Sequence, residues 1–169
     1  GKILLDWMES LRERNLVTRI GASIYDSKDI KNLPIRRLQI LQMPLSIYDQ
    51  RLMVDGSIQR LYDLGISIHV RSIFLQGLIL TDSANWPKFC SKEFIDHHSK
   101  VENQVKNLGS TLLESSLAYV HGFEQIEAVL VGITSLKELN QIIKAWNSRN
   151  LTNINSRNMT DQWAWPVRK

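Results

Sequence analysis

Short apolar segments alternate with amphipathic segments along this chain, and this alternation restricts its fold more than any other feature. Residues 16–25, 38–46, 66–77 and 128–133 are rich in apolar and β-branched side chains, as strands are. Segments of helical character precede, separate or follow them. Alternation of this kind predicts an α/β fold in which helices pack outside a parallel sheet.

The helical segments have recognisable ends. Residues 49–65 and 110–122 are predicted helices that end at a glycine. The last helix is predicted to begin at Ser135, because Ser135 and Glu138 have the spacing of a capping box. Residues 80–99 show weak periodicity, so we expect a long loop in which a helix starts late.

Composition limits the classes of protein to which the chain can belong. It has 169 residues, enough for one core, and we expect one domain over residues 1–147 and a polar tail over 148–169. No run approaches the roughly 18 apolar residues of a membrane span. The net charge of +4 is scattered, which argues against nucleic-acid binding. A single cysteine excludes an internal disulfide and a clustered thiolate metal site, and we predict a cytoplasmic protein.

Polar side chains follow the predicted strands where each one ends. The carboxyl ends of parallel strands converge on one edge of the sheet, and ligands bind there. The sequence therefore predicts a shared binding rim, with solvation at separate loops as the alternative for each residue. Gly132 and the helix after it add a possible approach for an anion such as phosphate, unless Ser135 and Glu138 satisfy those helical amides. The residues of the predicted rim are Ser23, Gln42, Arg71, Ser72 and Thr134.

Four segments resemble, in order, blocks of the aldo/keto reductase superfamily. They are RIGASIYDSKDI, LQILQMPLSIYDQRL, IHVRSIFLQGLIL and LAYVHGFEQIEAVLVGITSLKELNQII, within residues 3 to 147. The resemblance is to the C-terminal half of that family. It implies a partial (β/α)8 barrel, with strands five to eight and their helices, that binds a nicotinamide dinucleotide across the strand ends.

The resemblance also assigns roles to individual residues. Ser23 and Gln42 match positions that hold the nicotinamide carboxamide, and Arg71 stands where the family has a tyrosine stacked on the ring. A guanidinium can stack in the same way, and its alternative is an ordinary pair with a carboxylate. Ser72 and Phe74 match the pyrophosphate segment. At the adenosine end the matching positions are Gly132, Thr134, Glu138 and Gln141.

The resemblance leaves the choice of cofactor open. NADP is the family default, but a carboxylate at Glu138 would repel a 2′-phosphate and accept bonds from free ribose hydroxyls. NAD is therefore the competitor. The substrate of a complete enzyme would be a small carbonyl compound or alcohol.

None of the family's four catalytic residues, an aspartate, a tyrosine, a lysine and a histidine, can be matched to this sequence. The chain starts without methionine and within a helical pattern, so we expect a fragment or a processed chain, inactive by itself. Half a barrel exposes two strand edges, and we expect self-association or pairing with the missing half. The alternative is a non-catalytic nucleotide-binding or interaction module that retains the same rim.

Overall fold

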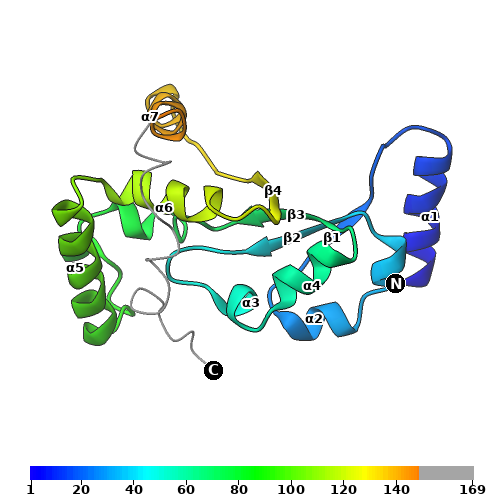
Figure 1. Ribbon diagram of the computed structural model, residues 1–169, viewed down its shortest axis with the longest axis horizontal. Helices are drawn as coiled ribbons and strands as arrows, with labels where there is room; N and C mark the ends of the chain where they lie inside the picture. Colours follow the sequence, from blue (N-terminus) through cyan, green and yellow to red (C-terminus); the bar gives the residue numbers. More distant parts are fainter. Residues whose placement is uncertain (149–169) are drawn as a thin grey trace.

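The protein forms a parallel four-stranded sheet in the computed structural model, which describes residues 1–148 (Figure 1). Each strand pairs in parallel with the next one along the chain, so the spatial order is the sequence order. This confirms the predicted α/β class. The strands are β1 (Gly21–Ser23), β2 (Ile40–Pro44), β3 (Ser67–Arg71) and β4 (Ile126–Val129).

Helices occupy the connections between the strands. In Figure 1, α4 and α6 flank the strands, α1 stands at one end of the molecule and α5 at the other. No helix within residues 1–148 combines the length and apolar character needed to cross a bilayer. The helices are α1 (Lys2–Glu13), α2 (Ser27–Lys31), α3 (Arg51–Val54), α4 (Ser57–Asp63), α5 (Lys92–Asn107), α6 (Leu112–His121) and α7 (Leu136–Trp146), with short 3-10 turns at Ile35–Arg37, Leu78–Leu80 and Ser83–Asn85.

The core lies between the helices and one face of the sheet. Alternate residues of a strand point to opposite faces, and Leu41 and Met43 of β2 and Ile68 and Val70 of β3 are fully buried. They belong to one hydrophobic cluster with side chains of α4 and α6. The intervening residues point to the other face and remain partly exposed: Ile40, Gln42, Ser67, His69 and Arg71.

The four observed strands are shorter than the predicted segments, and the last two differ most. β3 ends at Arg71 instead of continuing to Gly77, because Ser72 adopts a left-handed backbone with φ 62°. The last strand, predicted over 128–133 and buried on both faces, is β4 at Ile126–Val129 and is partly exposed. β4 is the last strand of the sheet, so one of its edges pairs with β3 and its other edge is unpaired in the described sheet.

Two other segments refine the predicted boundaries. The helix expected over 49–65 is divided into α3 and α4 by Gly56, whose φ is 73°. The helix expected late in the loop over 80–99 is α5, which begins at Lys92 and is capped by the Ser91 side chain. The polar tail predicted for 148–169 lies outside the described residues apart from Ser148.

Candidate functional site

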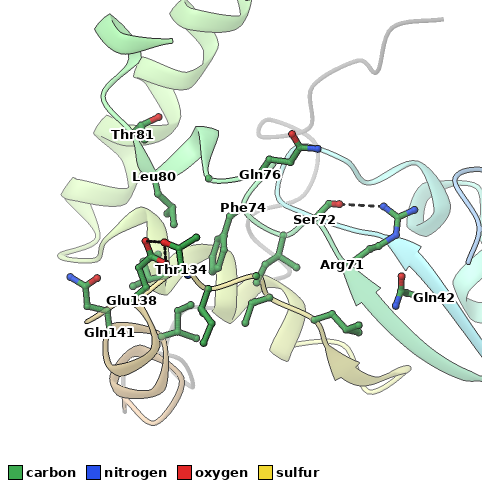
Figure 2. A pocket seen from close by; sticks show the side chains of 18 residues that line it. Gln42, Arg71, Ser72, Phe74, Gln76, Leu80, Thr81, Thr134, Glu138 and Gln141 are labelled. Atoms are coloured by element: carbon green, nitrogen blue, oxygen red, sulfur yellow. Dashed lines mark hydrogen bonds between the residues drawn. The ribbon is translucent and has the colours of Figure 1, made fainter. Parts of the chain in front are cut away.

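A cleft of about 840 Å³ opens where β2, β3 and β4 end (Figure 2). Its volume falls within the range of about 300 to 1,000 Å³ that is typical of ligand sites. Figure 2 shows Arg71 and Ser72 at one end, which we name the β3 end, and Thr134 and Glu138 at the other, the α7 end. The predicted site residues that line it are Gln42, Arg71, Ser72, Phe74, Gly132, Thr134, Glu138 and Gln141.

Arg71 is held at the β3 end by two hydrogen bonds and a ring contact. Its Nη2 donates to the carbonyl of Ile24 at 3.1 Å, and its Nη1 donates to Ser72 Oγ at 3.3 Å. The guanidinium carbon lies 4.5 Å from the centroid of the Tyr25 ring. The side chain is therefore fixed by a carbonyl, a hydroxyl and an aromatic face.

Ser23 and Gln42 are brought together by the sheet. They are register partners in the pairing of β1 with β2, and Ser23 Oγ donates to Gln42 Oε1 at 3.4 Å. Gln42 lines the cleft, whereas Ser23 touches the cleft only through Gln42. The predicted pairing of these two residues at one mouth is thus present, with the serine set back from it.

The loop after β3 forms one wall of the cleft in an unusual backbone conformation. Ser72, Leu75 and Gln76 all have positive φ although none is a glycine, and Gly77 follows with φ 88°. Such conformations cost energy and cluster at functional sites. The loop places Phe74, which is mostly buried, and Gln76 on the cleft wall.

The α7 end is organised by one carboxylate. Glu138 Oε2 accepts from the backbone amide of Thr134 at 2.7 Å, and both of its oxygens accept from Thr134 Oγ1 at 3.0 Å. The Thr134 amide is the main reason that the pKa of Glu138 lies below its ordinary value. Ser135 Oγ accepts from the Glu138 amide, as the capping box predicts.

This arrangement changes what the α7 end can bind. Glu138 already fills the positive N-terminal end of α7 with negative charge, so an incoming phosphate would meet a carboxylate there. Gly132 has no steric requirement for being a glycine, since a side-chain carbon at that position would have no atom within 4 Å. The α7 end is therefore suited to hydroxyl donors.

Several residues of the cleft were not predicted as site residues. Gln76 and Gly77 interrupt the apolar run of residues 68–80, and that interruption is a detectable sequence signal. Leu113 comes from α6 and has no signal of its own, because its helical spacing is also that of a core residue. The remaining additions are mainly apolar: Ile73, Leu80, Thr81, Leu130, Val131, Ile133 and Ile142.

A second polar cluster lies near the start of β3. Arg19 donates to Glu127 at 2.9 Å and to Ser67 Oγ at 2.8 Å, and the Arg19 bond lowers the pKa of Glu127 to about 2. His69 Nε2 is 3.8 Å from Glu127 and makes no hydrogen bond. These groups tie β3 to β4 and to the residues before β1. Within residues 1–148 no cluster of His, Cys, Asp and Glu has the composition of a metal site.

Tyr48 and His98 form a buried pair away from the cleft lining. Tyr48 Oη and His98 Nδ1 are 2.9 Å apart, and Trp86 packs on the His98 ring with centroids at 4.5 Å. Burial lowers the pKa of His98 and raises that of Tyr48. The pair joins the segment after β2 to α5.

Comparisons with known proteins identify the fold. No protein-family model matches the chain, and no curated protein matches it. Among solved structures, the holo form of aldo-keto reductase AKR11C1 from Bacillus halodurans superposes with a TM-score of 0.76 at 19% identity, covering 94% of this chain and 54% of that one. The thermostable aldo-keto reductase Tm1743, solved with the inhibitor epalrestat, gives 0.63 at 18% identity, covering 90% and 53%.

The chain thus spans about half the length of the solved structures that it matches. Its fold is that of a partial (β/α)8 barrel of the aldo-keto reductase type, and the resemblance seen in the four sequence blocks is confirmed at the level of fold.

Proposed function

We propose that this chain is the cofactor-binding, C-terminal half of an NAD(P)-dependent oxidoreductase resembling the aldo/keto reductases. The observation that carries the proposal is the cleft of about 840 Å³, which gathers polar side chains from the ends of β2 and β3 and from the start of α7. These residues are far apart in the sequence. An extended ligand with polar groups at both ends suits such a cleft.

The roles follow the length of the cleft. Gln42, with Ser23 behind it, binds the carboxamide, and Arg71 stacks on the nicotinamide ring. Ser72 and the backbone near Phe74 face the pyrophosphate. When bound, the cofactor supplies or accepts a hydride, and a small carbonyl compound or alcohol is its partner in the complete enzyme. The adenosine end is assigned to Gly132, Thr134, Glu138 and Gln141.

The α7 end supports NAD over NADP, which is the default of the resemblance. Glu138 is charged at neutral pH, as a glutamate of ordinary pKa is, and the Thr134 amide lowers its pKa further. A carboxylate repels the 2′-phosphate of NADP and accepts hydrogen bonds from ribose hydroxyls.

Titration of the 169-residue chain with NADH and with NADPH tests the cofactor and its type together. Trp86 is a suitable fluorescent reporter, because its Nε1 donates to the carbonyl of Thr81, a residue of the cleft. We expect quenching by both ligands, with tighter binding of NADH. Lys144→Gln, on α7 but outside the cleft lining, is the matched control. No quenching by either ligand refutes the proposal, and tighter binding of NADPH refutes the assignment of Glu138.

We also propose that the catalytic residues come from a second half-barrel. β1 and β4 are the outer strands of the described sheet, and each has one unpaired edge there. α1 also exposes Ile3, Leu4 and Trp7, and α7 exposes Leu136 and Ile143. Unpaired strand edges and exposed apolar side chains favour association, either with another copy or with a distinct half. A concentration-independent monomer in sedimentation velocity would exclude self-association.

A non-catalytic nucleotide-binding module is the second candidate. It is favoured by the cleft lining, which contains no tyrosine, histidine or lysine among residues 1–148 to act as a proton donor. Measuring NADH oxidation with a series of aldehydes, before and after adding the N-terminal half of an aldo/keto reductase barrel, separates the two. Turnover only with the added half supports the oxidoreductase half, no turnover in either case supports the module, and turnover by this chain alone would contradict both. A cytoplasmic location, proposed from the lone cysteine, suits both candidates.

A further inference from the structure

We infer that Tyr25 is a positioning residue that holds the guanidinium plane of Arg71 so that its opposite face is presented to the cleft. The inference rests on the proposed function. A guanidinium is planar and has two faces on which an aromatic ring can stack. Tyr25 lies 4.5 Å from the guanidinium carbon, and Arg71 lines the cleft while Tyr25 does not. The Tyr25 ring thus contacts the guanidinium from outside the cleft lining.

The edge of the guanidinium, which carries its N–H donors, is also held in place. Its two bonds, to the Ile24 carbonyl and to Ser72 Oγ, use donors that lie in the guanidinium plane and so oppose its rotation. Ile24 is buried, and its amide donates to the carbonyl of Gln42 at 2.8 Å. The carbonyl that orients Arg71 is thus anchored to β2, next to the residue assigned to the carboxamide.

The backbone of Tyr25 is anchored as well. Its amide donates to Asp29 Oδ2 at 2.7 Å, and Asp26 caps the start of α2. The side chain, however, is 68% exposed, so it contributes little to the core. An anchored backbone and an exposed ring lying on a cation indicate that the ring serves Arg71 and not the packing of the fold.

Preorganisation explains why a ring on the outer face helps a ligand on the inner face. A free arginine has many rotamers, and ordering it on binding costs affinity. With Tyr25, Ile24 and Ser72 in place, the guanidinium is already ordered before an aromatic ring arrives. The structure thus assigns Arg71 as the middle layer of a stack made of Tyr25, the guanidinium and the nicotinamide.

The test compares Tyr25→Leu with Tyr25→Phe in the full chain, using NADH and ADP-ribose as ligands. ADP-ribose lacks the nicotinamide ring, so it reports only on the remainder of the cleft. We expect Tyr25→Leu to weaken NADH binding roughly fivefold, the size of a partly exposed cation–π contact, and to leave ADP-ribose unchanged. Tyr25→Phe keeps the ring face and should stay within about twofold of the wild type.

The same two variants made in an Arg71→Leu background complete a double-mutant cycle. There, Tyr25→Leu should have no further effect on NADH, because the residue through which Tyr25 acts is gone. Thermal unfolding of each variant monitors the fold. Equal losses for NADH and ADP-ribose, or an undiminished effect in the Arg71→Leu background, would overturn the inference in favour of a general structural role.

Failure of the inference is distinguishable from failure of the proposed function. A wild-type chain that binds neither NADH nor ADP-ribose refutes both. A wild-type chain that binds NADH, together with a Tyr25→Leu variant that binds it equally well, refutes the role of Tyr25 alone.

Discussion

The two ends of the cleft are built in different ways. At the β3 end, Arg71 is held by groups from the segment after β1 and from its own loop, and Gln42 comes from β2. At the α7 end, Glu138 bonds to Thr134, four residues away on the same chain segment. The β3 end therefore depends on the sheet, whereas the α7 end forms locally.

The difference extends to charge and to unused bonding capacity. Arg71 brings a cation with five N–H donors, of which two hydrogen bonds use only part. Glu138 brings an anion whose two oxygens already accept bonds from Thr134. The β3 end is therefore prepared for an aromatic or electron-rich group, and the α7 end rejects anions.

Arg71→Ala should give the largest effect. Removing the guanidinium deletes the surface assigned to the nicotinamide, and we expect NADH binding to fall by about tenfold or more, or about 1.5 to 2 kcal/mol, as for a partly desolvated cation–π contact. ADP-ribose binding should be nearly unchanged, because the α7 end is intact. NADH affinity is measured by quenching of tryptophan fluorescence, and ADP-ribose affinity by isothermal titration calorimetry.

Arg51→Ala is the matched control for that variant. Arg51 is bonded to Asp49 and lies outside the cleft lining, so its removal should leave both ligands unaffected. If Arg71→Ala binds NADH as the wild type does, Arg71 has only a structural role at the β3 end and does not contact the nicotinamide.

Glu138→Gln should change the preference between cofactors. The amide keeps an oxygen for Thr134 but removes the charge, and we expect NADPH to gain about fivefold relative to NADH, near 1 kcal/mol for a charge pair in water. Because the pKa of Glu138 is lowered, the contribution of its charge to the wild-type preference should be lost only as pH falls through that lowered pKa. A ratio unaltered by the substitution would place the 2′-phosphate elsewhere.

Ser135→Ala tests whether the α7 end keeps its arrangement without the cap of α7. Ser135 caps α7 by accepting from the Glu138 amide, and loss of such a cap costs about 1 kcal/mol of unfolding free energy. The Glu138 bonds to Thr134 remain, so NADH binding should change less than stability does. Urea unfolding measures the change in stability, with Ser10→Ala on α1 as a control at a partly exposed serine that does not cap a helix. A collapse of cofactor binding would show that the cap organises the whole α7 end.

The convergence of the strand ends could be predicted from the sequence, because the carboxyl ends of parallel strands lie at one edge of the sheet. The predicted β3 was too long. Ile73 and Phe74 are apolar, as strand residues are, but they lie in a loop with left-handed residues and are buried there. Apolar character indicates burial but not the backbone that achieves it. The wall supplied by Leu113 was also beyond prediction, since helical spacing does not say which neighbours a helix will meet.

The α7 end shows the limit at the scale of single bonds. The capping box correctly placed the Ser135 hydroxyl on the Glu138 amide. The return bond of the Glu138 carboxylate goes to Thr134, one residue earlier, where an amide and a hydroxyl are offered together. Spacing rules identify the capping residues, but competition between neighbouring donors depends on the actual geometry.

Ser23→Ala should have the smallest effect and marks the boundary of the β3 end. Its hydroxyl lies 3.4 Å from Gln42 Oε1, a long hydrogen bond at an exposed position, and Ser23 is absent from the cleft lining. We expect NADH affinity to fall by about twofold or less, below 0.5 kcal/mol, because Gln42 keeps its place in the paired strands. A tenfold loss in the same fluorescence titration would mean that Ser23 reaches the ligand directly. In that case the β3 end would include β1, and pairing of the free edge of β1 with another strand would be coupled to cofactor binding.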